Sequence, residues 1–256
     1  MNTFSFIKID DEGEFVSMVL NRPPLNVMNI SMMKEINSAL EGLHHHPAAK
    51  VLSLRADGKA FSAGVDVADH TADKVGEMMG EFHRMFELLA KFNIPTIAVV
   101  DGAALGGGCE LAIGCDMIVA SPRAKFGQPE IKVGVFPPIA AALLPRLIGR
   151  NRTLEFLLHG EAISAPEAER IGLINKVFPL EGFDQHVDGF IRSITTNSKI
   201  IIEMTKKAVD EGLDSSSFDA ITKAEKLYLG DMMATLDAAE GLKAFLEKRQ
   251  PAWRNR

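Results

Sequence analysis

Cysteine is scarce in this sequence: the chain of 256 residues has two, Cys109 and Cys115. They are too few and too close together for a disulfide framework, and their spacing is not that of a CxxC motif. No histidine lies near Cys109 in the sequence, so both residues are best interpreted as small buried side chains in a reducing compartment. No spacing of His, Cys and Asp is typical of a zinc or iron site, and we expect no bound metal.

Basic stripes and long apolar runs are also missing. The net charge is −6, which excludes a general nucleic-acid-binding protein. The first six residues have neither the basic start nor the apolar core of a signal peptide. The most apolar long stretch, 94–120, contains Asp101, Glu110 and Asp116, so no membrane span is predicted. We expect a cytoplasmic protein with no nucleic-acid or membrane partner.

Several common catalytic motifs are absent. The Gly-Lys pair at 58–59 is followed by alanine, so it is not a P-loop. The glycines at 106–108 lack the third glycine of a dinucleotide-binding fingerprint, because position 111 is leucine. No serine stands in a GxSxG elbow. The three histidines at 44–46 lie at the C-terminal end of a predicted helix. A partly charged histidine is favourable there because it faces the negative end of the helix dipole, and metal binding is the weaker alternative for these residues.

The pattern that is present alternates strands and helices. The sequence predicts a hairpin over 4–10 and 15–20, strands over 51–54, 95–100 and 116–120, and helices from Ile30 to before Pro47 and over 73–92. Segments 59–66 and 125–131 are predicted loops, and a helix over 139–148 is interrupted by Pro145. After about residue 180 only helices are expected, over 183–194, 201–211 and 236–249. This order predicts an α/β fold followed by a helical end.

The segment Gly102–Glu110 is the strongest candidate for an active site. It follows the predicted buried strand 95–100 and places three glycines at the start of a helix. The first N–H groups of a helix have no partner within it and carry the positive end of its dipole. Glycines let a ligand approach these groups. The N–H of Gly107 is therefore an available donor, with the carboxylate of Glu110 one turn further along.

Two further features fit this interpretation. A second carboxylate, Glu130, follows Gly127-Gln-Pro129, and two carboxylates that share a site can separate their pKa values into an acid and a base. The alternative for either glutamate is an ordinary surface charge. Gly64 permits a turn that frees the N–H of Val65, and with Gly107 this would form an oxyanion hole.

The chain resembles the crotonase, or enoyl-CoA hydratase/isomerase, superfamily almost from end to end. The motifs that carry the resemblance are Asn21-Arg-Pro-Pro-Leu-Asn26, Lys59-Ala-Phe-Ser-Ala-Gly-Val-Asp66, Gly102-Ala-Ala-Leu-Gly-Gly-Gly-Cys-Glu-Leu-Ala112, Phe126-Gly-Gln-Pro-Glu130, Leu144-Pro-Arg-Leu-Ile-Gly149, Gly172-Leu-Ile-Asn-Lys-Val177 and Glu240-Gly-Leu-Lys-Ala-Phe-Leu-Glu-Lys-Arg249. The resemblance implies a spiral of ββα turns over 1–195 with the acyl-CoA site, and a helical trimerisation region over 196–256. It also implies assembly as a homotrimer or homohexamer.

The resemblance further implies a role for each candidate residue. Val65 and Gly107 would form the oxyanion hole for a CoA thioester, and Glu110 and Glu130 would be catalytic. Residues implied at the substrate and CoA site are Phe61, Ala63, Gly64, Asp66, Val67, Gly106, Phe136 and Pro138. Lys248 and Arg249 are candidates for the CoA phosphates. Because CoA is part of the substrate, no separate cofactor is expected.

The implied reaction is hydration of a double bond conjugated to the thioester, or its reverse. Phe136-Pro-Pro-Ile-Ala-Ala-Ala142 stands where many hydratases have a glycine-rich loop. It resembles the branch that hydrates cyclohexa-1,5-diene-1-carbonyl-CoA in anaerobic aromatic degradation. The alternatives are a short-chain enoyl-CoA hydratase of fatty-acid β-oxidation, an enoyl-CoA isomerase, and a catalytically silent acyl-CoA-binding scaffold.

Overall fold

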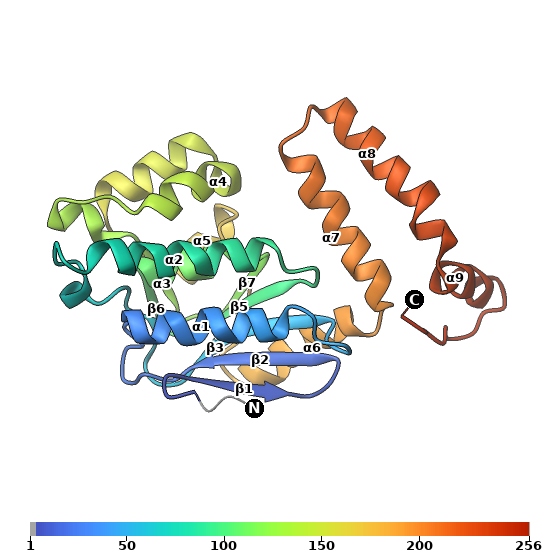
Figure 1. Ribbon diagram of the computed structural model, residues 1–256, viewed down its shortest axis with the longest axis horizontal. Helices are drawn as coiled ribbons and strands as arrows, with labels where there is room; N and C mark the ends of the chain where they lie inside the picture. The colour runs from blue at the N-terminus through green and yellow to red at the C-terminus, as the bar shows by residue number, and fades with distance from the viewer. Residues whose placement is uncertain (1–3, 256) are drawn as a thin grey trace.

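Two β-sheets form the centre of the body in the computed structural model, which describes residues 4–255 (Figure 1). The larger has the order β1-β2-β3-β5-β7-β10 and the smaller the order β4-β6-β8-β9. The strands are β1 Ile7–Asp11, β2 Phe15–Leu20, β3 Val51–Ala56, β4 Ala60–Ser62, β5 Thr96–Val100, β6 Ala103–Leu105, β7 Met117–Ala120, β8 Lys125–Gly127, β9 Ile163–Ser164 and β10 Lys176–Val177. The pairs β1–β2 and β8–β9 are antiparallel and the other pairs are parallel.

Each ββα turn of the spiral supplies one strand to each of the two sheets. The pairs β3/β4, β5/β6 and β7/β8 follow one another in this way, and a helix or 3₁₀ helix comes after each pair. The predicted α/β class and spiral of ββα turns are confirmed. The predicted loops at 59–66 and 125–131 are wrong in part, because β4 and β8 lie within them. Three residues are too few to show the alternation by which a strand is recognised.

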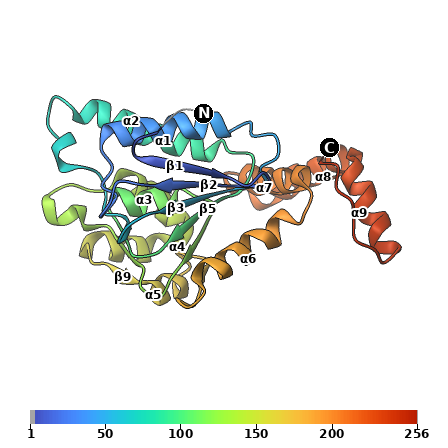
Figure 2. The same ribbon diagram turned by 90° about the horizontal axis from the view of Figure 1, so that it is seen from below.

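Helices cover both faces of the larger sheet (Figure 2). The helices are α1 Ile30–Leu43, α2 Val75–Ala90, α3 Gly107–Ile113, α4 Pro138–His159, α5 Ala165–Arg170, α6 Phe183–Thr195, α7 Lys199–Leu213, α8 Ser217–Gly230 and α9 Leu236–Leu246, with 3₁₀ helices η1 Val67–Asp69, η2 Pro129–Val133 and η3 Met232–Ala234. The paired helices α1 and α2 lie on one side of the larger sheet. On the other side, Phe183, Val187 and Ile191 of α6 pack against Val51, Ile97 and Val119 of the sheet.

Two helix predictions need correction. α4 continues through Pro145 and is broken at Gly149, whose φ of 75° and ψ of 158° are not helical. Helix α8 was not predicted. Phe218 and Ile221 of this helix are exposed in the described chain, so its apolar residues do not form a core-facing stripe.

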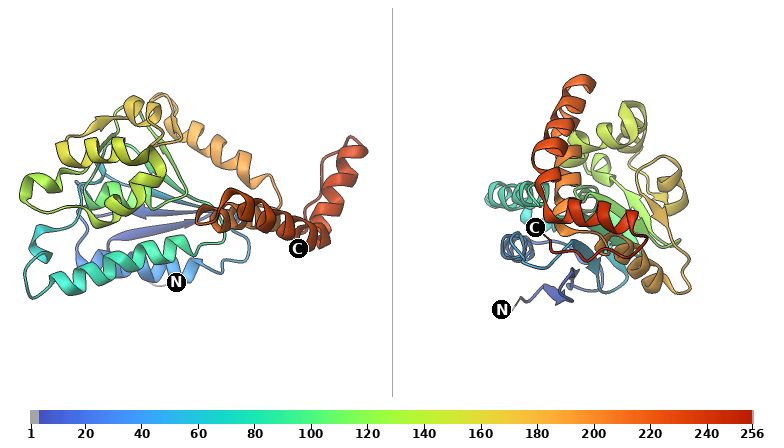
Figure 3. Two further views of the ribbon diagram at one scale, coloured as in Figure 1. Left: turned by 90° about the horizontal axis from the view of Figure 1, so that it is seen from above. Right: turned by 90° about the vertical axis from the view of Figure 1, so that its right-hand side faces the viewer.

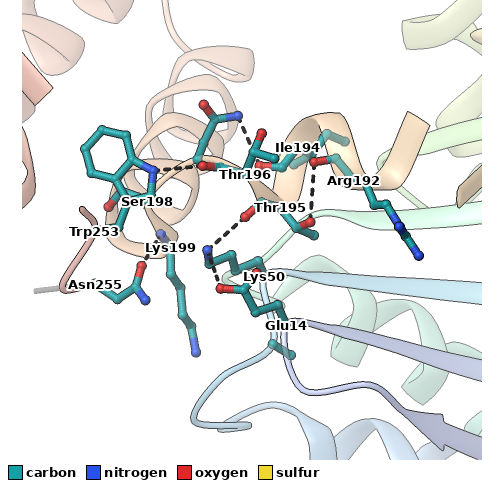
Figure 4. A network of polar contacts seen from close by, with 12 residues as sticks. Glu14, Lys50, Arg192, Ile194, Thr195, Thr196, Ser198, Lys199, Trp253 and Asn255 are labelled. Atoms are coloured by element: carbon teal, nitrogen blue, oxygen red, sulfur yellow. Dashed lines mark hydrogen bonds and ion pairs between the residues drawn. The ribbon is translucent and has the colours of Figure 1, made fainter. Parts of the chain in front are cut away.

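Helices α7–α9 form an arm that projects from one side of the body (Figures 1 and 3). Contacts at the junction of α6 and α7 fix where the arm begins (Figure 4). The buried Lys50 ammonium donates to the carbonyl of Thr195 at 2.8 Å. The Trp253 indole donates to Thr196 O, and Asn255 Oδ1 accepts the N–H of Lys199 at 2.9 Å. The C-terminal segment therefore holds the start of the arm.

Within residues 4–255, none of the helices combines the length and apolar character needed to span a bilayer. The same residues contain no cluster of three or more His, Cys, Asp or Glu side chains suited to a metal ion. The predicted absence of a signal peptide concerned residues 1–6, of which 1–3 lie outside the described residues.

Candidate active site

The segments that carry the N–H groups of Val65 and Gly107 meet at the start of α3. Met28 bonds through its N–H and C=O to Gly64 and Asp66, so the N–H of Val65 between them points away from Met28. Gly107 is the first residue of α3, where an N–H has no partner within the helix. Within residues 4–255, neither N–H donates to a backbone carbonyl. A Cβ placed on Gly64 would lie 3.6 Å from the nitrogen of Gly107, so the two segments are in contact.

Glycine is required at positions 106 and 107, where the chain enters α3. Gly106 has φ 51° and ψ −129°, and a Cβ there would lie 2.6 Å from Oε1 of Glu130. A Cβ on Gly107 would lie 2.6 Å from Cγ2 of Val65. The close approach of Glu130 to Gly106 and of Val65 to Gly107 therefore depends on the missing side chains. It brings one carboxylate next to the pair of N–H donors.

Glu110 is the fourth residue of α3 and its side chain is buried. Its Oε1 accepts the N–H of Ala140, in the first turn of α4, at 2.9 Å. Burial raises the pKa of Glu110 to about 7, and the Glu130 carboxylate adds to the rise, while the N–H groups of Ala140 and Ile139 oppose it. Glu110 can therefore hold or release a proton near neutral pH.

Glu130 lies in η2 and is only partly buried. Burial raises its pKa also, opposed by its own backbone N–H and by the charge on His70. The charge of Glu130 raises the pKa of Glu110, and the Glu130 carboxylate lies against Gly106, the residue that precedes α3. Glu130 therefore lies near the helix that carries Glu110, and a shared catalytic role stays a prediction. The two carboxyl groups are separated by 20 residues in the chain, and tertiary packing brings them together.

Gln128 contacts the carboxylate of Glu130, and the sequence analysis did not identify it as a site residue. Its side chain is fully buried. The amide is assigned with its nitrogen toward Glu130, because the opposite orientation sets its oxygen against the carboxylate. In that orientation it donates to both carboxylate oxygens, at 3.2 and 3.1 Å. The only available signal was its place two residues before Glu130.

The sequence profile described as enoyl-CoA hydratase/isomerase matches residues 11–256. The chain belongs to this family. The predicted membership of the crotonase superfamily is thereby confirmed, and with it the expectation of an enzyme. The match covers both the body of the molecule and the arm of α7–α9.

Named relatives cover nearly the whole chain. A crotonyl-CoA hydratase from Syntrophomonas wolfei is 35% identical, over 95% of this chain and 96% of its own. A cyclohexa-1,5-dienecarbonyl-CoA hydratase from Thauera aromatica is 33% identical, over 97% of this chain and 96% of its own. The crystal structure of an enoyl-CoA hydratase from Bacillus anthracis superposes with a TM-score of 0.93 at 29% identity, covering 98% of this chain and 100% of that one.

Within this family member, the segment predicted to bind CoA is only partly accessible. The side chain of Phe61 is 0% exposed and packs in the core, so a contact with CoA through its backbone stays a prediction. Phenylalanine in a short buried strand is held there by its apolar surface. Gly64 is buried and Ala63 is half-buried. Val67 is 82% exposed at the start of η1.

Asp66 has a structural partner. Its Oδ1 accepts the N–H of Ala68 and so caps η1, and its Oδ2 lies 3.5 Å from the guanidinium of Arg22. These contacts fix the loop that follows Val65. The structure therefore fixes Asp66 next to Val65, and a contact of Asp66 with substrate stays a prediction.

Phe136 and Pro138 lie at the entrance to α4. Phe136 is 69% exposed, and Pro138 is the first residue of the helix, where its lack of an N–H costs no helical bond. The next two residues carry the N–H groups that face Glu110. The segment thus leads into the helix start that contacts Glu110, and a contact of Phe136 or Pro138 with substrate stays a prediction.

Of the three remaining candidates, Cys109 and Arg249 are not free for the roles considered. Burial raises the pKa of the Cys109 thiol, so this cysteine is not a reactive thiolate. Arg249 lies beyond α9 and pairs with Glu240 at 2.6 Å and Glu247 at 2.7 Å, so its guanidinium is already neutralised. Lys248 next to it stays a candidate for the CoA phosphates by position alone.

Proposed function

We propose that this protein is a hydro-lyase that adds water across a carbon–carbon double bond conjugated to a CoA thioester, or removes it. The observation that carries the proposal is the meeting of two N–H donors, Val65 and Gly107, with two acidic side chains, Glu110 and Glu130. The names of the relatives support hydration over other reactions of the family.

The proposed mechanism assigns each group one task. The thioester oxygen accepts hydrogen bonds from the two N–H groups, which stabilise the negative charge that develops on it. One carboxylate takes a proton from water as the water oxygen bonds to the β-carbon. The other carboxyl group gives a proton to the α-carbon. The pair ends with one proton, as it began, because one is gained and one is given.

The test is hydration of crotonyl-CoA by the purified chain in water enriched in oxygen-18. Hydration predicts one labelled oxygen in the product and a falling absorbance of the conjugated thioester. An isomerase would shift the double bond without incorporating label. A silent acyl-CoA-binding protein would bind the ester, with no product of either kind across a panel of acyl groups.

For the acyl group, we propose a cyclic dienoyl-CoA, cyclohexa-1,5-diene-1-carbonyl-CoA, as in anaerobic aromatic degradation. The support is the sequence of the segment that leads to Glu110: Phe136, Pro138 and Ile139 stand where many hydratases have glycines, which favours a compact ring over a flexible chain. Sequence identity does not separate the alternatives, because the relatives named for the cyclic and the crotonyl substrate are 33% and 35% identical. Fast hydration of crotonyl-CoA with no turnover of the cyclic ester would assign the chain to fatty-acid β-oxidation.

We also propose that the arm, within 196–256, associates with further copies of this chain as a homotrimer or homohexamer. Exposed apolar side chains on the arm support this: Val209, Leu213, Phe218, Ile221, Tyr228, Leu229, Leu242, Phe245 and Leu246. An isolated chain would leave these side chains in water. Sedimentation equilibrium gives the mass, and a monomer at micromolar concentration would rule out this proposal. A cytoplasmic location stays a prediction.

A further inference from the structure

Gln128 is a buried amide in the short segment between β8 and Glu130. Its side chain is 0% exposed. Pro129 follows it as the first residue of η2, and Glu130 is the second. Proline fixes its own φ, so the backbone between Gln128 and Glu130 has little freedom. The segment is also tied to the start of α3, because the N–H of Gly106 donates to Gly127 O at 2.9 Å.

The direction of the Gln128 amide follows from its neighbours. With its oxygen toward Glu130, the amide would set one acceptor against the two acceptors of the carboxylate, and its nitrogen would face only donors. With its nitrogen toward Glu130, both ends of the amide face suitable partners. The nitrogen then lies 3.2 Å from Oε1 and 3.1 Å from Oε2 of Glu130. A buried hydrogen bond of this kind is stronger than the same bond in water.

The Glu130 carboxylate therefore has two neighbours that fix its place. Its Oε1 lies 2.6 Å from where a Cβ of Gly106 would stand, so the carboxylate rests against the glycine turn. The Gln128 amide bonds to both oxygens of the same carboxylate. A free glutamate side chain samples many rotamers. A partner that holds both oxygens keeps the carboxylate in one of them before substrate arrives.

We propose that Gln128 is a positioning residue that holds the Glu130 carboxylate in place for proton transfer. This inference rests on the proposed function and deepens it. Proton transfer requires the carboxylate to be within hydrogen-bond reach of the proton, and a small displacement of a reacting group is costly. Gln128 acts through Glu130 and is not assigned a contact with substrate.

Gln128→Met tests this role, because methionine is unbranched and flexible like glutamine but has no N–H donor. The kcat for hydration should fall about 10–100-fold, the loss expected for one hydrogen bond to a charged group, and KM should change little. Asn37→Leu is the matched control. The Asn37 amide is also buried and donates to a glutamate, Oε2 of Glu81 at 2.8 Å, but it joins α1 to α2. This variant should keep the wild-type kcat.

The same substitution in a Glu130→Gln background separates positioning from packing. If Gln128 acts through Glu130, Gln128→Met should lower kcat by less than about two-fold once the carboxylate is gone, because the two effects are coupled. A merely structural role would lower kcat by the same factor in both backgrounds, and that result would overturn the inference. A wild-type kcat in the single variant Gln128→Met would overturn it as well.

NMR gives a readout that needs neither turnover nor a change at Gln128. In wild type, the side-chain amide signal of Gln128 should shift with pH as Glu130 titrates, and this shift should be absent in Glu130→Gln. Glu110 and His70 also carry charges that interact with this carboxyl pair, and they are the same in both chains. A Gln128 signal that does not respond to Glu130 would overturn the inference. A wild-type chain inactive on every enoyl-CoA would refute the proposed function, and the NMR comparison would still decide whether Gln128 holds Glu130.

Discussion

The carboxylate of Glu110 accepts the N–H of Ala140 at 2.9 Å, so the first turn of α4 holds the side chain of a residue in α3. Helix N-termini favour negative charge. Burial nevertheless dominates, since the pKa of Glu110 is raised to about 7 from an ordinary 4.5. The site keeps a carboxyl group in a state where its proton is easily exchanged.

This relationship predicts a dependence of stability on pH. Because the folded state binds the Glu110 proton more tightly than the unfolded state, this group lowers the stability of the folded state as pH rises from about 4.5 to about 7. Glu110→Gln retains the acceptor for Ala140 and has no charge to bury. It should be more stable than wild type at about pH 8, by up to about 3 kcal/mol, and close to wild type at about pH 4.

Urea unfolding at fixed protein concentration at the two pH values measures this difference. Glu12→Gln, at an exposed position in the first hairpin, is the control. A stability difference between Glu110→Gln and wild type that is the same at both pH values would contradict a buried, titrating Glu110.

The second prediction concerns Val65 and Gly107, the proposed oxyanion donors. Val65→Pro removes one N–H, and kcat should fall about 10²–10³-fold, equivalent to about 3–4 kcal/mol of barrier. Ser217→Pro, at the exposed first position of α8 and outside the proposed substrate site, is the control, because proline is tolerated there. Steady-state hydration kinetics distinguish the two. Equal losses in both variants would show that the N–H of Val65 has no special role.

The third prediction concerns Gly106. A methyl group there would displace the Glu130 carboxylate, since a Cβ would lie 2.6 Å from its Oε1. Gly106→Ala should lose most hydration activity. Gly172→Ala tests strain alone, because Gly172 also has a positive φ, of 80°, with nothing within 4 Å of its Cβ position. If both variants kept wild-type kcat, the placement of Glu130 against Gly106 would be wrong.

The fourth prediction concerns the base of the arm. Asp237 is buried and accepts the N–H groups of Arg254 at 2.7 Å and Asn255 at 2.8 Å, and the hydroxyl of Ser198 at 2.5 Å. Asp237→Ala leaves these donors without an acceptor and should destabilise the arm by about 1–3 kcal/mol.

Trp253 reports on this change, because it is the single tryptophan of the chain and its indole bonds to Thr196 O. Its fluorescence should change at lower urea in Asp237→Ala than in wild type. Asp184→Ala, at an exposed surface ion pair, should unfold as wild type does. A wild-type urea midpoint for Asp237→Ala would show that these bonds do not hold the arm.

The sequence predicts the parts of the site that depend on neighbouring residues. Three glycines before Glu110 predict an open helix start, and Gly64 predicts a turn that frees the N–H of Val65. The long-range contacts were not predictable from spacing, because Ala140 reaches Glu110 only through the packing of α4 on α3. Gln128 was missed for a similar reason, since its role depends on which way a buried amide points.

In the fold too, the features that depend on contacts between distant parts of the chain were not predictable from the sequence. Longer segments such as β2, β5 and α1 were predictable, because β2 and β5 are almost wholly buried apolar strands and α1 buries one face. Strands β4 and β8 have three residues each and form only because the spiral brings them beside β6. The sequence predicts a helix break at Pro145, but the backbone turns at Gly149, where a residue without a side chain adopts a positive φ.

The most direct measurement of the central claim is the hydration rate of Glu110→Gln and Glu130→Gln with crotonyl-CoA and with the cyclic dienoyl-CoA. Both variants keep the shape of the side chain and lose its acid–base chemistry. We predict that each lowers kcat by about 10²–10⁴-fold on whichever ester the wild type hydrates. Wild-type rates in both variants would contradict a mechanism that depends on the two carboxyl groups.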